Sequence, residues 1–391
     1  MDKDLIVFAS YARTPIGGFQ GVFARSSAVD LGAAAVAAAV ARAKIPPEGI
    51  EKIFMGCVLP AGLGQAPARQ AALKAGLADS VEATTINKMC GSGMQTVIMA
   101  HDALLAGSAG IIVAGGMESM SNAPYLLAKH RAGARIGHDV VKDSMYLDGL
   151  EDAYTPGKLM GAFAEESAQA YQITREAQDA YAIESLSRAN RATTTGQFAA
   201  EVVPVNVGTD TPVAVDEQPG KAKPERIPHL KPVFAKDGTI TAANASSISD
   251  GAVALVMMRL SVAHALGVKP VARLVAHAAH AHAPALFTTA PVPAIRRVLE
   301  KSGWTRADVD LFEVNEAFAV VAMIAMHDLG IPHDVLNVNG GACALGHPIG
   351  ASGARIIVTL LAALQARGLK RGVAGVCIGG GEATAVAVEL L

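Results

Sequence analysis

The sequence predicts an α/β fold made of two similar halves, with a long segment inserted into the first half. Segments typical of helices alternate with segments typical of strands near both ends of the chain, as in layered α/β proteins. The same order of elements, including a glycine-rich turn, occurs once in each half. The 391 residues are 51% hydrophobic and 17% charged, which is enough apolar side chain for two domain-sized cores.

Each half is predicted to contain two repeated units. The chain begins with a buried strand at 5–9. The first repeated unit is a helix followed by a short strand, and its two copies span residues 30–57 and 294–314. The second unit is a glycine-rich turn, a helix with one apolar face and a β-branched strand. Its copies have turns at 90–93 and 346–353, helices at 94–105 and 356–364, and strands at 111–113 and 373–378. This alternation predicts mostly parallel sheets covered by helices.

The stretch 121–249 fits neither half and is predicted to be an inserted loop domain. The expected division is residues 1–120 plus 250–270 for the first half, 121–249 for the insertion and 271–391 for the second half. The insertion holds a helix near Arg175–Arg191 and a basic segment at 129–142. Long insertions are usually lids or binding loops, whereas a basic run taken alone is usually a solvated face.

Composition and motifs exclude several classes of protein. With 4% aromatic residues and a net charge of −2, a nucleic-acid surface is not expected. The polar start does not resemble a signal peptide, and no apolar run approaches the roughly 20 residues that span a membrane, so we expect a cytoplasmic protein. No cysteine pair has Cys-x-x-Cys spacing, and no nucleotide-binding glycine motif occurs, so neither a metal nor a nucleotide cofactor is expected.

Cys90 is the clearest candidate nucleophile, because it stands in a Cys-Gly-Ser-Gly turn where a helix begins. The free N–H groups and partial positive charge of a helix N-terminus favour the thiolate and predict a lowered cysteine pKa. The alternative is an inert core cysteine, the commoner fate of an intracellular thiol.

Three further segments hold candidate acid–base groups. His347 lies among glycines and can act as a base, unless it is an ordinary turn histidine. Cys377 ends a strand where burial would keep it protonated, and the N–H groups of Gly379 and Gly380 could bind an oxyanion. Asn315 could hold a water or cap a helix, and Glu316 could orient an imidazole.

Taken together, these motifs closely resemble the thiolase family, the acyl-CoA C-acyltransferases. The resemblance runs along the whole chain and rests on five motifs in order, at 87–93, 115–120, 315–318, 339–353 and 377–381. It implies a five-layer αβαβα fold of two similar halves with an inserted loop domain. It also implies reversible Claisen condensation of two acetyl-CoA, or of acyl-CoA with acetyl-CoA, to a 3-oxoacyl-CoA.

The resemblance also assigns roles to individual residues. Cys90 would take the acyl group, His347 would activate it, and Cys377 would move the α-proton of the second acyl-CoA. Asn315 would hold a water that forms one oxyanion hole with His347, and the N–H groups of Cys90 and Gly379 would form the other. A covalent thioester divides the difficult reaction into two easier steps.

The family further implies how coenzyme A, a substrate and product rather than a cofactor, would bind. The expected binding residues are Met160, Lys221, Phe234, Ser246 and Phe318. The basic segment 129–142 would become a cationic loop near the centre of a homotetramer. The motifs are compatible with any acyl chain length and with either direction of reaction.

Three alternatives remain open from the sequence. One is a ketoacyl synthase of the same fold, although the Cys-Ile-Gly-Gly-Gly segment at Cys377 favours a thiolase. A second is a non-catalytic acyl-CoA or lipid-binding protein on the same scaffold. A third is a redox sensor that pairs Cys90 with Cys377, which requires Cα atoms within about 7 Å.

Overall fold

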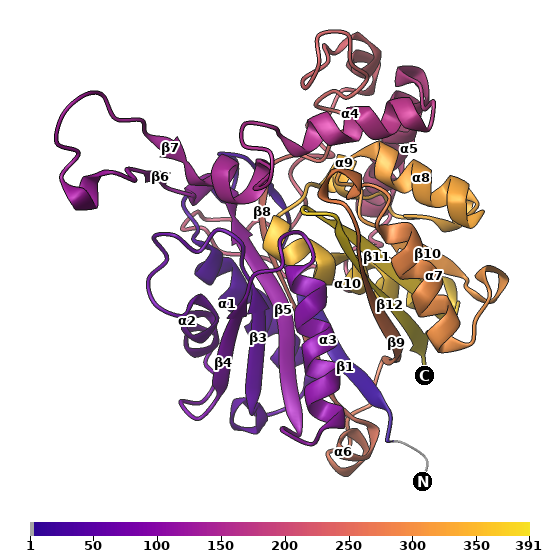
Figure 1. Ribbon diagram of the computed structural model, residues 1–391. Helices are drawn as coiled ribbons and strands as arrows, with labels where there is room; N and C mark the ends of the chain where they lie inside the picture. Colours follow the sequence, from indigo (N-terminus) through magenta and orange to yellow (C-terminus); the bar gives the residue numbers. More distant parts are fainter. Residues whose placement is uncertain (1–3) are drawn as a thin grey trace.

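The computed structural model describes residues 4–391 and contains one large mixed sheet with helices on its faces (Figure 1). The ten-stranded sheet has nine strands in one path, and β2 (Gly17–Gly18) pairs with β8 beside it. In spatial order the path is β10 (Leu311–Val314), β11 (Arg371–Ile378), β12 (Glu382–Leu390), β9 (Ala272–Ala281), β1 (Ile6–Arg13), β8 (Ser249–Arg259), β5 (Ile111–Ser119), β3 (Lys52–Gly56) and β4 (Glu82–Ile86).

The sheet is a duplication, as the sequence predicts. The first half has the order β4-β3-β5-β8-β1, and the second half repeats it as β10-β11-β12-β9. A parallel bridge between Phe312 and Leu336 occupies the position of the missing fifth strand. The two halves join where β1 meets β9, and only Val7 and Phe8 pair there with Arg273 and Ala272.

The prediction of mostly parallel sheets is wrong. Among the described strand pairs only β3–β4, β3–β5 and β10–β11 are parallel, and the others are antiparallel. The helix–strand repeats cover only the parallel part of each half. In the second half, β11 returns directly to β12 through the turn at 379–381, so no crossover helix separates them and the pair must be antiparallel.

Helices and sheets form five layers, which confirms the predicted αβαβα architecture. The central layer is α3 (Ser92–Leu105) and α10 (Ile349–Arg367), buried between the inner faces of the two halves. The outer layers are α1 (Ala28–Ala43) with α2 (Pro67–Lys74) on the first half and α7 (Pro291–Ser302) with α8 (Ala319–Leu329) on the second. Two short helices, α6 (Leu260–Ala265) and α9 (Ala342–Leu345), lie at connections.

The helix α10 is apolar on nearly all sides because it is enclosed between the two halves of the sheet. Among residues 4–391 it is the one helix long and apolar enough to cross a membrane, yet 89% of that stretch is buried inside the fold. Its hydrophobicity is therefore that of a core helix enclosed by protein.

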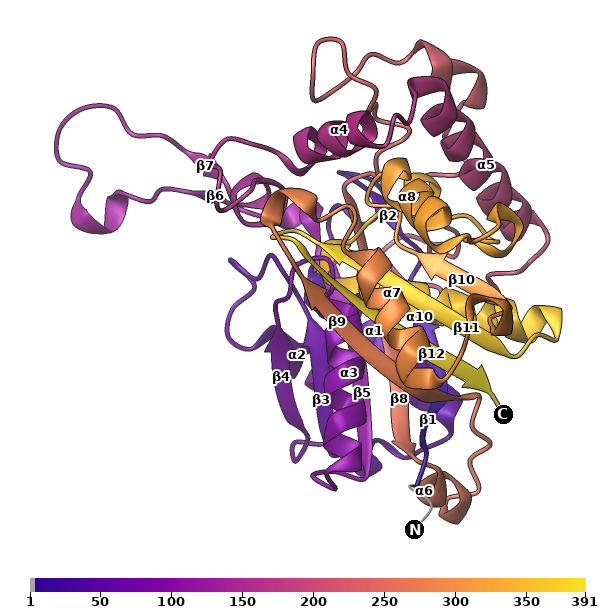
Figure 2. The ribbon, with the colours of Figure 1, turned by 45° about the vertical axis from the view of Figure 1, so that its right-hand side comes forward.

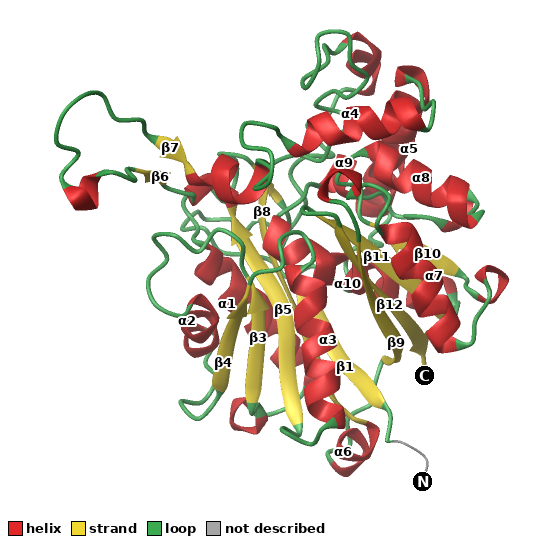
Figure 3. Ribbon diagram, in the orientation of Figure 1, coloured by secondary structure: helices red, strands yellow, loops and turns green. Residues whose placement is uncertain are grey.

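The insertion between β5 and β8 has two parts (Figures 2 and 3). A thin arm, closed at its base by β6 (Tyr125–Leu126) and β7 (Lys142–Asp143), extends away from the body. The remainder, mostly loops with α4 (Met160–Ala170) and α5 (Arg175–Thr194), lies next to α8 and α9. Thr174 caps α5 by accepting a hydrogen bond from the Ala177 N–H at 3.2 Å.

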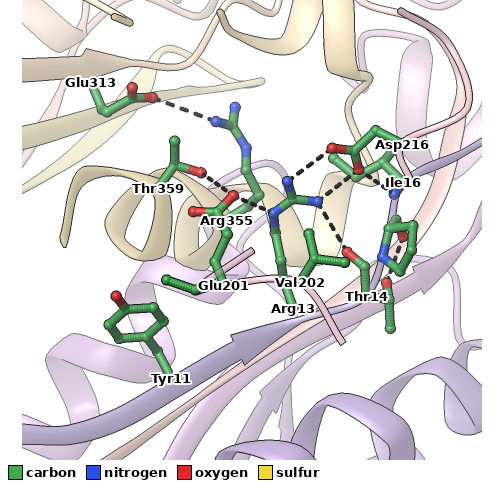
Figure 4. Close-up of polar contacts among 12 residues, drawn as sticks. Tyr11, Arg13, Thr14, Ile16, Glu201, Val202, Asp216, Glu313, Arg355 and Thr359 are labelled. Atoms are coloured by element: carbon green, nitrogen blue, oxygen red, sulfur yellow. Dashed lines mark hydrogen bonds and ion pairs between the residues drawn. The ribbon is translucent and has the colours of Figure 1, made fainter. Parts of the chain in front are cut away.

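A buried polar network fastens the insertion to both halves (Figure 4), because Glu201 pairs with Arg13 of the first half and accepts from the Thr359 hydroxyl of α10 in the second half at 3.3 Å. Arg13 of β1 contacts Glu201 at 2.6 Å and Asp216 at 2.7 Å, and both carboxylates belong to the insertion. Arg355 of α10 lies 3.5 Å from Glu313 of β10 in the same region. Burial raises the pKa of Glu313 to about 8 in spite of this arginine. Such a network fixes one arrangement of the three parts, because an uncompensated charge there would be costly.

Candidate active site

The turn that carries Cys90 is held in a strained conformation between β4 and α3. Met89 adopts φ +47°, a left-handed value unusual for a residue with a side chain. The Ser92 hydroxyl accepts from the Lys88 N–H at 2.8 Å and donates to the Met89 carbonyl at 2.7 Å. A Cβ on Gly91 would lie 2.4 Å from the Ile378 side chain. The turn is therefore pressed against the end of β11, which carries Cys377.

Cys90, Cys377 and Gly379 come together at this point, although they belong to different halves. The Gly379 N–H favours the Cys90 thiolate, and a charge on Cys90 raises the pKa of Cys377, so the three groups are neighbours. A cavity of about 500 Å³ is lined by residues that include Met89, Met160 and Gly379. The two thiols therefore lie behind a cavity whose wall includes a chain neighbour of Cys90 and the N–H donor at Gly379.

His347 and Asn315 form a second pair of buried polar groups. The Asn315 Nδ2 lies 3.5 Å from the His347 Nε2, and the Nδ1 contacts the Ser352 hydroxyl. That hydroxyl donates to the Pro348 carbonyl at 2.9 Å, so it accepts from an Nδ1–H and leaves Nε2 with its lone pair. The Asn315 Oδ1 has no protein partner, and it is free to accept from a bound water or a substrate.

The two pairs are adjacent because the helices behind them touch. Cys90 lies two residues before α3, and His347 lies two residues before α10. A Cβ on Gly93 would be 2.9 Å from the Ala354 nitrogen, and one on Gly353 would be 2.6 Å from the Met94 nitrogen. Only glycine allows the backbones of the two helices to approach this closely. Ile349 in the first turn of α10 packs in the apolar cluster that also contacts Cys90.

Burial controls the protonation of the three titrating groups. It lowers the pKa of His347 to about 3, and Arg355 acts in the same direction, so the imidazole is neutral. It raises the pKa of Cys377 well above its usual value, as the sequence predicts. It also raises the pKa of Cys90 to about 11, so the predicted lowering is wrong. The loss of water outweighs the N–H contacts at the start of the helix, and the resting nucleophile is a thiol.

Glu316 does not orient the imidazole, so this prediction is also wrong. Its carboxylate is fully buried and accepts hydrogen bonds from Tyr181, Ser185, Asn337 and the Cys343 N–H at 2.8 to 3.0 Å. It therefore anchors α5 and the 337–343 loop. The place expected for Glu316 is taken by Ser352, five residues after the histidine.

Glu118 is a buried group to which the sequence assigned no role. It lies on β5, and its carboxylate accepts from the N–H groups of Val58, Leu59 and Gly350 at 2.8 to 3.1 Å. Burial raises its pKa to about 7 against these hydrogen bonds. Glu118 thus connects the loop after β3 to the first turn of α10, beside His347. The available signal was one acidic residue in an otherwise apolar strand.

The expected coenzyme A residues divide between two places. The Met160 sulfur lies 3.3 Å from a Cβ position on Gly379, and the rings of Phe234 and Phe318 are 5.9 Å apart. The backbone N–H of Ser246 donates to the Ala317 carbonyl at 3.0 Å. Lys221 instead lines a second cavity of about 360 Å³. Other members of that lining are Lys223, Arg226, Ser247 and Cys343. One cavity is thus next to the thiols and the other is basic.

Comparisons with known proteins agree along the whole chain. Residues 6–261 match the family description "Thiolase, N-terminal domain" and residues 268–390 match "Thiolase, C-terminal domain". An acetyl-CoA acetyltransferase of Escherichia coli (strain K12) is 51% identical over 390 residues, which cover 98% of this chain and 99% of that protein. Acetyl-CoA acetyltransferase 2 of Arabidopsis thaliana is 47% identical over 392 residues, covering 99% and 97%.

Solved structures give the same result. Acat5 thiolase from Ascaris suum, in complex with coenzyme A, is 42% identical with a TM-score of 0.94, and the match covers 99% of this chain and 100% of that one. The Bacillus anthracis acetyl-CoA acetyltransferase is 37% identical with a TM-score of 0.96, over 100% and 99% of the two chains.

Proposed function

The chain belongs to the thiolase family, and on that premise we propose that it is an acetyl-CoA C-acetyltransferase. It joins two acetyl-CoA molecules, or an acyl-CoA and acetyl-CoA, into a 3-oxoacyl-CoA with release of coenzyme A, and it catalyses the reverse reaction. The observation that carries this proposal is the proximity of Cys90, Cys377 and the Gly379 N–H, beside a cavity that Gly379 lines.

In the first step Cys90 takes the acetyl group. The neutral His347 Nε2 removes the thiol proton, and the sulfur attacks the thioester carbonyl. The N–H groups of Cys90 and Gly379 stabilise the oxyanion. The leaving coenzyme A thiolate takes its proton from Cys377 and departs as a thiol. An acetyl-Cys90 thioester, a Cys377 thiolate and a protonated His347 remain.

In the second step a carbon–carbon bond forms. The Cys377 thiolate removes an α-proton from the second acetyl-CoA, and the raised pKa of this thiol makes the thiolate a strong base. Protonated His347 and a water held by Asn315 stabilise the enolate oxygen. The enolate carbon attacks the acetyl-Cys90 carbonyl, and the Cys90 thiolate leaves and recovers the proton from His347. All three groups return to their starting states.

We also propose that the insertion, residues 121–249, holds coenzyme A. Met160, Phe234, Phe318 and Ser246 would contact the pantetheine arm near the thiols, and the apolar rings suit that chain. Lys221, with the basic side chains around the second cavity, would face the phosphates. Coenzyme A acts as substrate and product in this scheme, so no resident cofactor is needed.

The arm of the insertion supports a proposed homotetramer. The side chains of Ile136, Val140 and Val141 are 97%, 66% and 56% exposed, next to the basic residues of segment 129–142. Apolar side chains so exposed on a projecting arm are typical of contacts between subunits. We propose a cytoplasmic homotetramer, and removal of residues 130–141 should leave a smaller oligomer in light scattering.

Mass spectrometry of the protein after incubation with acetyl-CoA tests the activity. We expect one acetyl group on the wild type and on Cys377→Ala, none on Cys90→Ala, and acetoacetyl-CoA from the wild type but from neither of these variants. Cys57→Ala is the matched control, since it removes a buried thiol that lines neither cavity and should retain condensation. A wild type that never becomes acetylated would instead be a non-catalytic acyl-CoA binder. Full condensation by Cys377→Ala would reject the two-cysteine mechanism and favour a ketoacyl synthase type of site.

A further inference from the structure

Two histidines and an aspartate meet at the surface between the two halves, away from the thiols. His101 and Asp102 lie on α3 of the first half, and His277 lies on β9 of the second half; Figure 1 shows these two elements facing each other. The Asp102 Oδ1 is 3.1 Å from the His101 Nδ1 and 3.0 Å from the His277 Nε2. The two imidazole rings are nearly perpendicular, with centroids 5.1 Å apart.

These distances suit three ligands of one metal ion. Ligands about 2.1 Å from a tetrahedral ion lie roughly 3.4 Å apart. The three ligand atoms all lie within 4.8 Å of one another. The two contacts with Asp102 are within about half an ångström of that separation, and the two imidazole nitrogens would approach each other by about 1.4 Å at most to complete the site.

The surroundings are also suitable for a metal ion. The side chains of His101 and His277 are only 13% and 23% exposed, so packing restricts both rings, whereas Asp102 is 58% exposed and leaves a side open to water.

We propose that His101, Asp102 and His277 form a site for a divalent transition metal such as Zn²⁺ or Co²⁺, which clamps α3 to β9. Two imidazoles and one carboxylate with open positions suit these ions, whereas Mg²⁺ and Ca²⁺ prefer oxygen ligands. The site would tie α3 of the first half to β9 of the second half, in addition to the β1–β9 junction and the contacts between α3 and α10. Without metal, the same atoms form two N–H···O hydrogen bonds to Asp102.

Thermal unfolding of the tag-free full chain tests this site. After dialysis against a chelator, Zn²⁺ or Co²⁺ at about 100 times its Kd should raise the Tm by roughly 3–5 °C. His277→Asn and Asp102→Asn should each abolish the rise in Tm. Both variants are measured so that the test still stands if one of them folds poorly. His327→Asn is the matched control, because His327 is an exposed histidine 2.8 Å from Asp328 without a second imidazole.

The comparison between variants decides the result, because the four thiols also attract soft metals. The site is supported if the wild type and His327→Asn gain stability with metal while the other two variants do not. It also requires that His277→Asn bind one Co²⁺ ion per chain fewer than the wild type. A metal-dependent rise that persists in His277→Asn or in Asp102→Asn, or no rise in the wild type, would overturn the proposal.

Discussion

The close contact between α3 and α10 leads to a quantitative prediction for Gly93→Ala. The new Cβ would lie 2.9 Å from the Ala354 nitrogen and 3.1 Å from the Ala351 oxygen, both backbone atoms of α10. Ordinary contacts of this kind need about 3.4 Å or more, so the helices must separate by roughly half an ångström. The unfolding free energy should fall by about 1–3 kcal/mol, a typical cost of overpacking.

The effect on catalysis should exceed the effect on stability. The two helices begin two residues after Cys90 and His347, so their separation moves the proposed nucleophile away from its proposed base. A misplacement approaching 1 Å can cost about 100-fold in rate, and we expect a 10- to 100-fold loss in the rate of Cys90 acetylation. Quenched-flow mass spectrometry with acetyl-CoA measures that rate, and urea unfolding measures the stability.

A matched variant separates this effect from the general cost of replacing glycine. Gly49→Ala places a Cβ 3.2 Å from the flexible Ile45 side chain, far from both central helices, and should acetylate at the wild-type rate. If Gly93→Ala acetylated within twofold of wild type and unfolded at the same urea concentration, the glycine contact would not be what aligns the site.

Three further predictions concern buried and interfacial charges. The Glu118 pKa rises from 4.5 to about 7 on folding, so the native state binds the proton more tightly and stability falls as pH rises between these values. The loss is about 3 kcal/mol, and urea unfolding at pH 5 and pH 8 should show a smaller decline for Glu118→Gln; equal slopes would contradict it. Arg13→Met leaves two buried carboxylates without the arginine that pairs with both, and should cost about 3–5 kcal/mol in urea unfolding, whereas a cost below 1 kcal/mol would contradict the network's role. Glu382→Gln breaks the part-exposed pair with Lys88 beside Cys90 and should cost at most about 1 kcal/mol, with any change in KM disappearing at high salt; a salt-independent change would point to another cause.

The repeated helices, strands and turns were predictable from the sequence because each depends on a pattern of residues that are close together in the chain. The helix at 294–302, the strand at 311–314 and the glycine-rich turn at Cys90 each depend on spacing within about 15 residues, and the structure has all three. The pairing of distant strands is not encoded in this way. The strands β8 and β12 were therefore missed as antiparallel neighbours of β5 and β11.

The pKa shifts of the candidate site residues were harder to predict from the sequence than the choice of those residues. The sequence singled out Cys90, His347 and Cys377 as candidates, but burial depends on everything that packs around a group. The Cys90 pKa was consequently predicted in the wrong direction. Glu118 and the pair of His101 with His277 depend on contacts between residues 60 to 230 positions apart, which no local pattern records.

The position of β12 in the sheet affects the order in which the chain can fold. It is the last strand in chain order, yet it lies between β9 and β11 with ladders on both sides. Until it arrives, both neighbours expose unpaired backbone edges, which are prone to aggregation. Because Gly379, the proposed donor, lies in the turn between β11 and β12, we expect the site to form only once β12 has been synthesised and inserted between its two neighbours.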